Sequence, residues 1–443
     1  MSIDLENDPL VRFLDTIMPP QAFTEYLERA LANSSALDEA LAGLDEAQAA
    51  RREQQAGLFP TLDLSFGSRV SFARDFSNDT DNVLERAQSR GRTDATFVLQ
   101  QRILDFGAQS IRIAAASSRL RAASVEIDRQ SELIVGNAIA TWYEVYTFRA
   151  LITLGDAYLT NQQELRAAIE ERIADGVSAR GDLATVDSTI AAHRARMTRY
   201  RRQLANAEAR FVEIFEIAPP SDIGRGPMMA PQFVSTDAVL LATRRSATVA
   251  RAEAEARAAL QDARAARADT LPQINAQIEG GRFGIFENEN DYDIRGSLTL
   301  THRFFGGGDA RADQAEARAN ARAARAETVR EEVRRQATIA WSDVQSLERQ
   351  LDALQSAYLS SRQSRDVIIE RFRFVRGTLI DVLNAEDNFF VTAALYVQTV
   401  TELDVARYIL ILRTGDLLNT LGLSRSSQSS YRLRAEQLPA ESQ

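Results

Sequence analysis

Two pairs of short stretches with alternating polarity limit most strongly what this chain can fold into. In the first pair, about 61–72 and 93–104, apolar residues occupy one parity and polar residues the other. The second pair, about 273–285 and 293–304, repeats the pattern. This period of two predicts antiparallel hairpins with one apolar and one polar face. A sheet needs about eight strands to close into a barrel, and an open sheet exposes its edges. One chain therefore cannot complete this structure alone.

The two pairs belong to an internal duplication. A helical pattern gives way to a strand at both Pro60 and Pro272, and the only two tryptophans, Trp142 and Trp341, occupy equivalent places in the two halves. Such self-similarity indicates two copies of one structural unit. The predicted organisation is an N-terminal extension at 1–20, a first repeat at 21–217, a linker at 218–236, a second repeat at 237–423 and a C-terminal tail at 424–443.

Long intervals without proline predict long helices, because proline breaks a helix interior. The helical period continues from Gly107 to about Asp175, and a second helix returns through 183–217. The second repeat predicts helices from 310 to about 375 and from 377 to 423. Two shorter helices are predicted at Phe23–Gly57, with Thr24 as its cap, and at 238–269, with a cap among residues 235–237.

Composition excludes several classes of protein. Much of the 45% hydrophobic content is alanine, which with Arg, Glu, Gln and Leu is typical of long helices and coiled coils. The net charge of −10 argues against a nucleic-acid partner. In the chain as given, the absence of cysteine excludes disulfides, thiolate metal sites and an acylated N-terminal cysteine. The two histidines, His193 and His302, have no neighbour at ligand spacing, so we expect no metal site, no cofactor and no enzymatic activity.

The sequence contains neither a membrane-spanning helix nor a recognisable signal peptide. No apolar run approaches the roughly 20 residues that a membrane-spanning helix needs, so any membrane insertion would use the strands. The first 20 residues carry acidic side chains and no basic flank before an apolar run, which does not match a signal peptide. Three readings follow: the export signal was removed, the start was assigned downstream of it, or the protein stays in the cytoplasm.

The order and duplication of four motifs give the chain a resemblance to the TolC family of outer-membrane efflux and secretion channels. These motifs are the strand-to-helix corners ILDFGAQ (Ile103–Gln109) and RFFGGGDARADQAEA (Arg303–Ala317), and the helix turns ERIADGVSARGDLATVD (Glu171–Asp187) and ERFRFVRGTLIDVLNAED (Glu370–Asp387). The resemblance implies a mainly α fold with a small β part. It implies a homotrimer in which four strands per chain form a 12-stranded β-barrel in the outer membrane, continued by a helical tunnel in the periplasm.

The two helix turns are the candidate functional site, because the resemblance places them at the periplasmic entrance. In the family, acidic residues form a ring around this entrance. By position the resemblance assigns that role to Asp182 and Asp381, with Asn384 following Asp381. The turn glycines are Gly176, Gly181 and Gly377. Phe372 stands where many members have tyrosine, so a latch that needs a phenolic hydroxyl is absent. Arg172, Arg371 and Arg376 are candidate salt-bridge partners. The alternative is that both aspartates only cap the returning helices.

These observations lead to two functional hypotheses. The first is a passive exit duct of a tripartite efflux or type I secretion system, to which a periplasmic adaptor and an inner-membrane ABC or proton-driven transporter dock. Outer-membrane lipid would surround its strands. The second is a soluble coiled-coil scaffold without transport activity, which the alanine-rich helices and the missing signal peptide favour.

Overall fold

The computed structural model describes residues 10, 14, 16–77, 80–84, 90–176, 178–227, 233–287, 291–374 and 377–423. The chain divides into two compact units. The helical unit comprises Met1–Leu41, Glu126–Ala250 and Arg330–Gln443, and the sheet unit comprises Ala42–Val125 and Arg251–Val329. Each unit therefore combines segments from both predicted repeats. The tail at 424–443 and most of the N-terminal extension lie outside the described residues.

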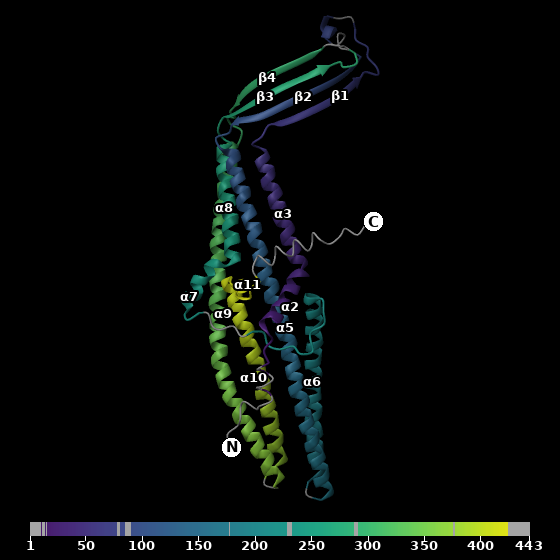
Figure 1. The fold of residues 1–443 in the computed structure, drawn as a ribbon, viewed down its shortest axis with the longest axis vertical. Helices are drawn as coiled ribbons and strands as arrows, with labels where there is room; N and C mark the ends of the chain where they lie inside the picture. The colour runs from purple at the N-terminus through teal and green to yellow at the C-terminus, as the bar shows by residue number, and fades with distance from the viewer. Residues whose placement is uncertain are drawn as a thin grey trace. The chain divides into compact units, whose positions relative to one another are not determined.

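The fold is mainly helical, as predicted (Figure 1). Its first half contains α2 (Pro20–Ala32), α3 (Ser35–Ala56), α5 (Ala108–Ala174) and α6 (Arg180–Phe215). Its second half contains α7 (Thr236–Ala242), α8 (Ala247–Ala268), α9 (Gly308–Arg373), α10 (Leu379–Thr414) and α11 (Leu417–Thr420). Short 3₁₀ turns stand at Thr80–Asn82 and Thr243–Arg245.

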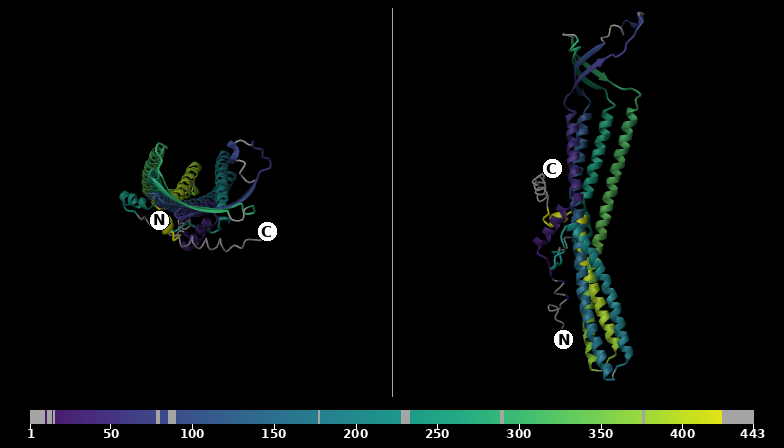
Figure 2. Two further views of the ribbon diagram at one scale, coloured as in Figure 1. Left: turned by 90° about the horizontal axis from the view of Figure 1, so that it is seen from above. Right: turned by 90° about the vertical axis from the view of Figure 1, so that its right-hand side faces the viewer.

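Four antiparallel strands form one sheet in the order β1-β2-β3-β4, which Figure 2 shows from above as a curved layer. The strands are β1 (Thr61–Val70), β2 (Gly91–Leu104), β3 (Gln273–Phe283) and β4 (Tyr292–Thr301). β1, β3 and β4 end two or three residues before the predicted limits, and β2 begins two residues earlier than predicted. Gly284, with φ 65°, turns the chain at the end of β3. The four predicted strands are therefore present, with different ends.

One face of this sheet is apolar across all four strands. The register pairs Leu62 with Leu99, Leu99 with Ile278, and Ala276 with Leu298. Side chains at paired positions point to the same face, so these pairs link the apolar parities of the four strands. This face is open: Leu64 is 77% exposed and Leu298 71% exposed. The sheet thus carries a continuous apolar surface that nothing in the described sheet unit covers.

Two of the shorter predicted helices are wrong in their extent. The predicted helix Phe23–Gly57 is broken into α2 and α3 at Asn33 and Ser34, where the Ser34 carbonyl accepts the first backbone hydrogen bonds of α3. Thr24 is not a cap, because α2 already begins at Pro20 and the Thr24 hydroxyl donates to the Pro20 carbonyl at 2.8 Å. A proline suits the first helical position, which needs no amide donor.

The predicted helix 238–269 is also divided, into α7 and α8. Ser235 caps α7 as predicted, accepting a hydrogen bond from the Ala238 amide at 3.3 Å. The break falls at Ser246, which is buried against Gly415 at the end of α10. Gly415 has φ 76°, and a Cβ there would lie 2.7 Å from the Ser246 Cα. A side chain at 415 would therefore displace the backbone that separates α7 from α8.

The equivalent tryptophans both lie in the core of the helical unit. Trp142 is fully buried and packs edge-on against Phe23, with ring centroids 5.4 Å apart. Its indole nitrogen donates to the Gly224 carbonyl at 2.8 Å. Trp341 belongs to an apolar cluster that includes Val239. In the first repeat, the tryptophan therefore also fixes the linker between the repeats.

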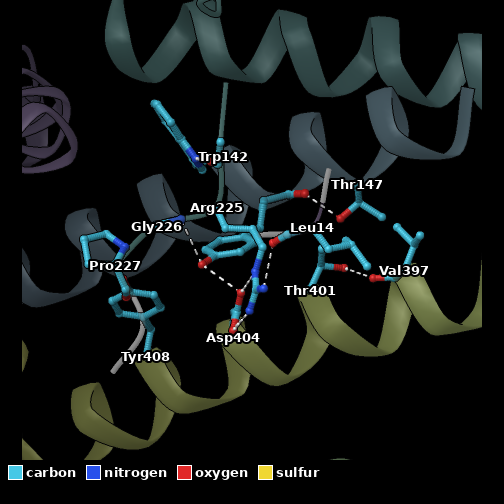
Figure 3. Close-up of polar contacts among 12 residues, drawn as sticks. Leu14, Trp142, Thr147, Arg225, Gly226, Pro227, Val397, Thr401, Asp404 and Tyr408 are labelled. Carbon is cyan, nitrogen blue, oxygen red and sulfur yellow. Dashed lines mark hydrogen bonds and ion pairs between the residues drawn. The ribbon is translucent and has the colours of Figure 1, made fainter. Parts of the chain in front are cut away.

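A buried ion pair holds the same linker (Figure 3). Arg225 donates to both carboxylate oxygens of Asp404 on α10, at 2.7 and 2.9 Å, and to the Leu14 carbonyl at 2.8 Å. The Tyr143 hydroxyl donates to Asp404 at 3.2 Å and accepts from the Gly226 amide at 3.1 Å. Only 10% of the Arg225 side chain and 4% of the Asp404 side chain are exposed. Burial and the nearby Asp404 charge raise the pKa of Tyr143, which keeps its hydroxyl protonated as a donor.

Glu132 on α5 should make the stability of the helical unit depend on pH. Burial, with the charges of Asp128 and Asp416, raises its pKa from 4.5 to about 8. A raised carboxyl pKa gives stability that is complete below the unfolded pKa of 4.5 and lost as pH rises through about 8. We expect the thermal unfolding temperature to fall between about pH 5 and about pH 9, and Glu132→Gln to reduce that slope. Circular dichroism melts of both proteins check this, and an equal slope in the variant would assign the pH dependence to other groups.

Candidate functional site

The two helix turns singled out from the sequence lie at the same end of the helical unit (Figures 1 and 2). The first joins α5 to α6 and contains Gly176, whose φ of 73° is costly for residues with a side chain. Its amide donates to the Ile173 carbonyl at 3.0 Å, and the Ser178 amide donates to the Arg172 carbonyl at 3.1 Å. The second turn joins α9 to α10. Its Gly377 is described, whereas Arg376 lies outside the described residues.

Asp182 and Asp381 occupy equivalent positions in the first turns of α6 and α10. The Asp182 carboxylate accepts from the Ala179 amide at 3.1 Å. The Asp381 carboxylate accepts from the Thr378 amide at 3.3 Å and from its hydroxyl at 2.7 Å. The Thr378 hydroxyl accepts from the Asp381 amide at 3.2 Å, which completes a capping box. Both aspartates thus have the capping contacts of the alternative hypothesis, and their place in an acidic ring stays a prediction.

Arg172 and Phe372 join the two turns. An Arg172 guanidinium nitrogen donates to the Phe372 carbonyl at 3.3 Å, and the guanidinium carbon lies 4.6 Å from the centre of the Phe372 ring. This cation–π contact needs no phenolic hydroxyl, so Phe372 can pair with Arg172 although it cannot form the contact that a tyrosine hydroxyl would make. The other predicted residues, Arg371, Asn384 and Gly181, are exposed.

An apolar cluster behind the turns packs α5, α6, α9 and α10 together. Its buried members are Ile169, Val186, Ile190, Phe372, Leu379, Val382 and Leu383. Phe372 therefore has two roles, since its backbone and ring face contact Arg172 while its side chain is part of this cluster. The turns are consequently held by a shared core, and capping is one contribution among several.

Sequence reasoning missed three buried polar residues further along α5 and α10. Tyr158 and Glu386 are each 4% exposed, and Gln162 is fully buried. Burial raises the pKa of Glu386, against the opposing effect of the Arg365 charge. A signal was present, because Gln162 stands in a helical stripe whose other members, such as Leu165 and Ile169, are apolar. The pattern cannot show what a polar residue in such a stripe faces.

His193 has a packing role in the structure. It is buried between Tyr158 and Phe390, with ring centroids 4.3 and 4.9 Å away, and its Nε2 lies 2.9 Å from the Gly155 carbonyl. Burial lowers its pKa, which favours the neutral ring. Within the described ranges, no group of three or more His, Cys, Asp or Glu residues is arranged to hold a metal ion.

No helix in the described part of the chain is both long enough and apolar enough to cross a membrane.

Comparisons with known proteins concern the chain as a whole. The family model described as outer membrane efflux protein matches residues 26–215 and 239–415. The chain is 22% identical to the outer membrane efflux protein BepC of Brucella suis, over 76% of this chain and 77% of that protein. It is 25% identical to the pyoverdine export outer membrane protein OpmQ of Pseudomonas aeruginosa, over 84% and 80%. Its fold is similar to that of the outer membrane protein VceC of Vibrio cholerae, with a TM-score of 0.74 and 19% identity over 91% and 96%.

Proposed function

Because the chain belongs to the outer membrane efflux protein family, we propose that three copies of it form the exit duct of a tripartite efflux or type I secretion system. The protein is an outer membrane efflux channel and a non-enzymatic transport protein. The proposal adds the number of copies, the closure of the sheet and the partners.

The open apolar face of the sheet carries the proposal. An apolar surface spread over four strands is unstable in water unless another layer covers it, and lipid is a suitable cover. The two outer strands, β1 and β4, each have one neighbour in the described sheet. Joining β4 of one copy to β1 of the next would pair these edges, and three copies would close a 12-stranded barrel. The opposite face, which carries polar residues such as Asp63 and Ser65, would then line a wet interior.

The partners follow from the same proposal. A passive duct supplies no energy, so an inner-membrane ABC or proton-driven transporter has to drive export. A periplasmic adaptor protein would connect that transporter to the end of the helical unit that holds the two turns. Outer-membrane lipid would contact the apolar sheet face.

The duct hypothesis predicts that arginine disrupts the assembled protein on one face of β1 and is tolerated on the other. Leu64→Arg places a charge on the apolar face, and such a charge at the bilayer midplane costs about 2–4 kcal/mol. Ser65→Arg, its neighbour and matched control, places the same charge on the polar face. We expect Leu64→Arg to lower the amount of trimer recovered from outer membranes, and Ser65→Arg to leave it near the parent level. Quantitative blotting of unheated membrane fractions measures both.

Planar-bilayer recordings separate the duct from the scaffold hypothesis. The purified parent protein should insert and conduct ions as a trimer. A protein that stays monomeric in water and produces no conductance would support the coiled-coil scaffold, and so would equal membrane recovery of the two arginine variants.

A further inference from the structure

Two neighbouring cavities open in the helical unit, between α5 and the pair α9 and α10. The first has a volume of about 310 Å³ and the second about 530 Å³. They share three lining residues, Asn161 on α5, Arg365 on α9 and Glu386 on α10. The shared wall makes the two cavities neighbours in one groove that a single molecule can occupy.

Gln162 is a fully buried side chain that lines the second cavity. Neither its amide nitrogen nor its amide oxygen has a hydrogen-bond partner in the protein. Because both atoms are unpaired, this holds whichever way the amide group is turned. Buried polar groups are nearly always paired, since an unpaired one loses its hydration without compensation. Gln162 therefore presents an unused donor and an unused acceptor side by side to the cavity.

Three further buried atoms have the same mixed character. Tyr158 and Glu386 are each 4% exposed, and the Tyr158 hydroxyl and Glu386 Oε2 have no hydrogen-bond partner. Arg172 Nε, in the wall of the second cavity, is also unpaired. The arginine nitrogen donates, the carboxylate oxygen accepts, and the hydroxyl does either. Unused donors and acceptors are thus evenly matched, so a ligand that pairs them needs both kinds of group.

The full charges around the groove also balance. Three arginines and three glutamates line the second cavity: Arg172, Arg365, Arg373, Glu164, Glu171 and Glu386. At the shared wall, Arg365 is paired with Asp366 at 2.7 Å. Arg362 adds a positive charge to the first cavity but already has a contact within the protein. A charged ligand would lose its hydration without gaining a free counter-charge, so these walls favour a neutral one.

The first cavity is largely aromatic. Its walls include Tyr158, Tyr358, Phe389 and Phe390. The Arg365 guanidinium carbon lies 4.0 Å from the centre of the Phe389 ring. Aromatic walls favour a planar ring, which stacks on them or meets them edge-on. Tyr158 and Gln162 are one helical turn apart on α5, or about 5–6 Å between their Cβ atoms, so a ring and a polar group of one small molecule can reach both cavities.

We propose that the groove between α5, α9 and α10 binds a neutral aromatic amide, with its ring in the first cavity and its carboxamide paired to Gln162 in the second. A carboxamide carries a donor beside an acceptor and is therefore the complement of the Gln162 side chain. Its second N–H would reach toward Glu386. The inference goes beyond the exit duct and does not depend on it, because the lining residues belong to the helical unit of one chain.

Fluorine NMR on the purified full-length protein tests the proposal with 4-fluorobenzamide as the probe. Its signal should broaden on binding and titrate to one site per chain. 4-Fluoroacetophenone has nearly the same shape and an acceptor oxygen but no N–H donor. We expect it to bind about tenfold more weakly, because Gln162 Oε1 and Glu386 Oε2 would stay unpaired. 4-Fluorobenzoate, which adds a charge and has no donor, should bind no better than the ketone.

Two variants test the two ends of the groove. Gln162→Leu removes both amide atoms and should weaken 4-fluorobenzamide binding about tenfold. Ala157→Phe starts from an exposed position in the wall of the first cavity, fills that cavity and should abolish binding. Gln163→Leu changes the exposed neighbour of Gln162, which lines neither cavity, and is the matched control with unchanged affinity.

Melting temperatures without ligand separate lost binding from lost folding. Gln162→Leu removes an unpaired buried amide, so it should melt at or above the parent temperature. If it melts lower, Ala157→Phe decides, because that change adds a side chain at an exposed position. The proposal is overturned if 4-fluorobenzamide gives no saturable broadening, if the ketone or the acid binds as tightly as the amide, or if either folded variant binds like the parent.

Discussion

Replacing Asp404 with alanine should lower the thermal unfolding temperature of the helical unit more than any other single change to a charged side chain described here. The substitution leaves the buried Arg225 guanidinium without its carboxylate (Figure 3). It also removes the acceptor of the Tyr143 hydroxyl. Breaking a buried ion pair in this way costs about 3–5 kcal/mol. Circular dichroism melts of the purified protein give the change.

An exposed ion pair provides the matched control. Asp156 pairs with Arg201 at 3.0 Å, but their side chains are 50% and 59% exposed. Asp156→Ala should therefore cost no more than about 1 kcal/mol. Replacing both buried partners, as in Arg225→Met with Asp404→Leu, should restore part of the stability lost in Asp404→Ala, because no unpaired charge stays buried. Equal, small effects of Asp404→Ala and Asp156→Ala would show that the linker pair is not a principal support of the fold.

Removing the two turn aspartates together should change ion selectivity strongly. In a trimer, Asp182 and Asp381 would supply six carboxylates to one narrow entrance, and their mutual repulsion would be relieved by bound cations or arginine partners. Asp182→Ala with Asp381→Ala should therefore weaken both cation selectivity and block by divalent ions in planar bilayers. Because both residues also accept a hydrogen bond from the N-cap amide, as the third residues of α6 and α10, the alanine pair should lose some stability as well.

The corresponding asparagine pair separates charge from capping. Asparagine keeps an oxygen that can accept the Ala179 and Thr378 amide hydrogen bonds but carries no charge. We expect Asp182→Asn with Asp381→Asn to lose selectivity as fully as the alanine pair while unfolding near the parent temperature. An asparagine pair that selects cations and is blocked like the parent would place the entrance elsewhere. A trimer that forms only with asparagine would make capping the main role of these positions.

The regular parts of this fold could be predicted because their signals are local. Alternating polarity revealed all four strands, and proline-free intervals revealed α5, α6, α9 and α10. The interruptions were missed because Ser34 and Ser246 look like ordinary polar residues within a helical pattern. The break at Ser246 depends on its contact with Gly415, far away in the chain. Helical periodicity contains no information about such a distant contact.

In the candidate site too, the local features could be predicted and the long-range contacts could not. Glycine and aspartate mark the two turns locally, so Gly176, Asp182 and Asp381 could be found by position. The pairing of Arg172 with Phe372 joins residues 200 positions apart, and sequence reasoning had considered a salt bridge for that arginine. The Arg225–Asp404 pair, separated by 179 positions, gave no sequence signal at all. Long-range polar contacts depend on the packing of helices, which one sequence does not specify.

The edge strands of the sheet also matter for each chain between its synthesis and its assembly. A newly made chain presents backbone groups on β1 and β4 that have no partner in the described sheet, beside an apolar face that the described sheet unit leaves exposed. Those groups can join any exposed strand, including one on a partly folded neighbour. The wrong encounters become more frequent as the chain accumulates, so overproduction should favour aggregates over finished channels. A cell that makes this protein therefore has to match the rate of synthesis to the rate at which chains find one another.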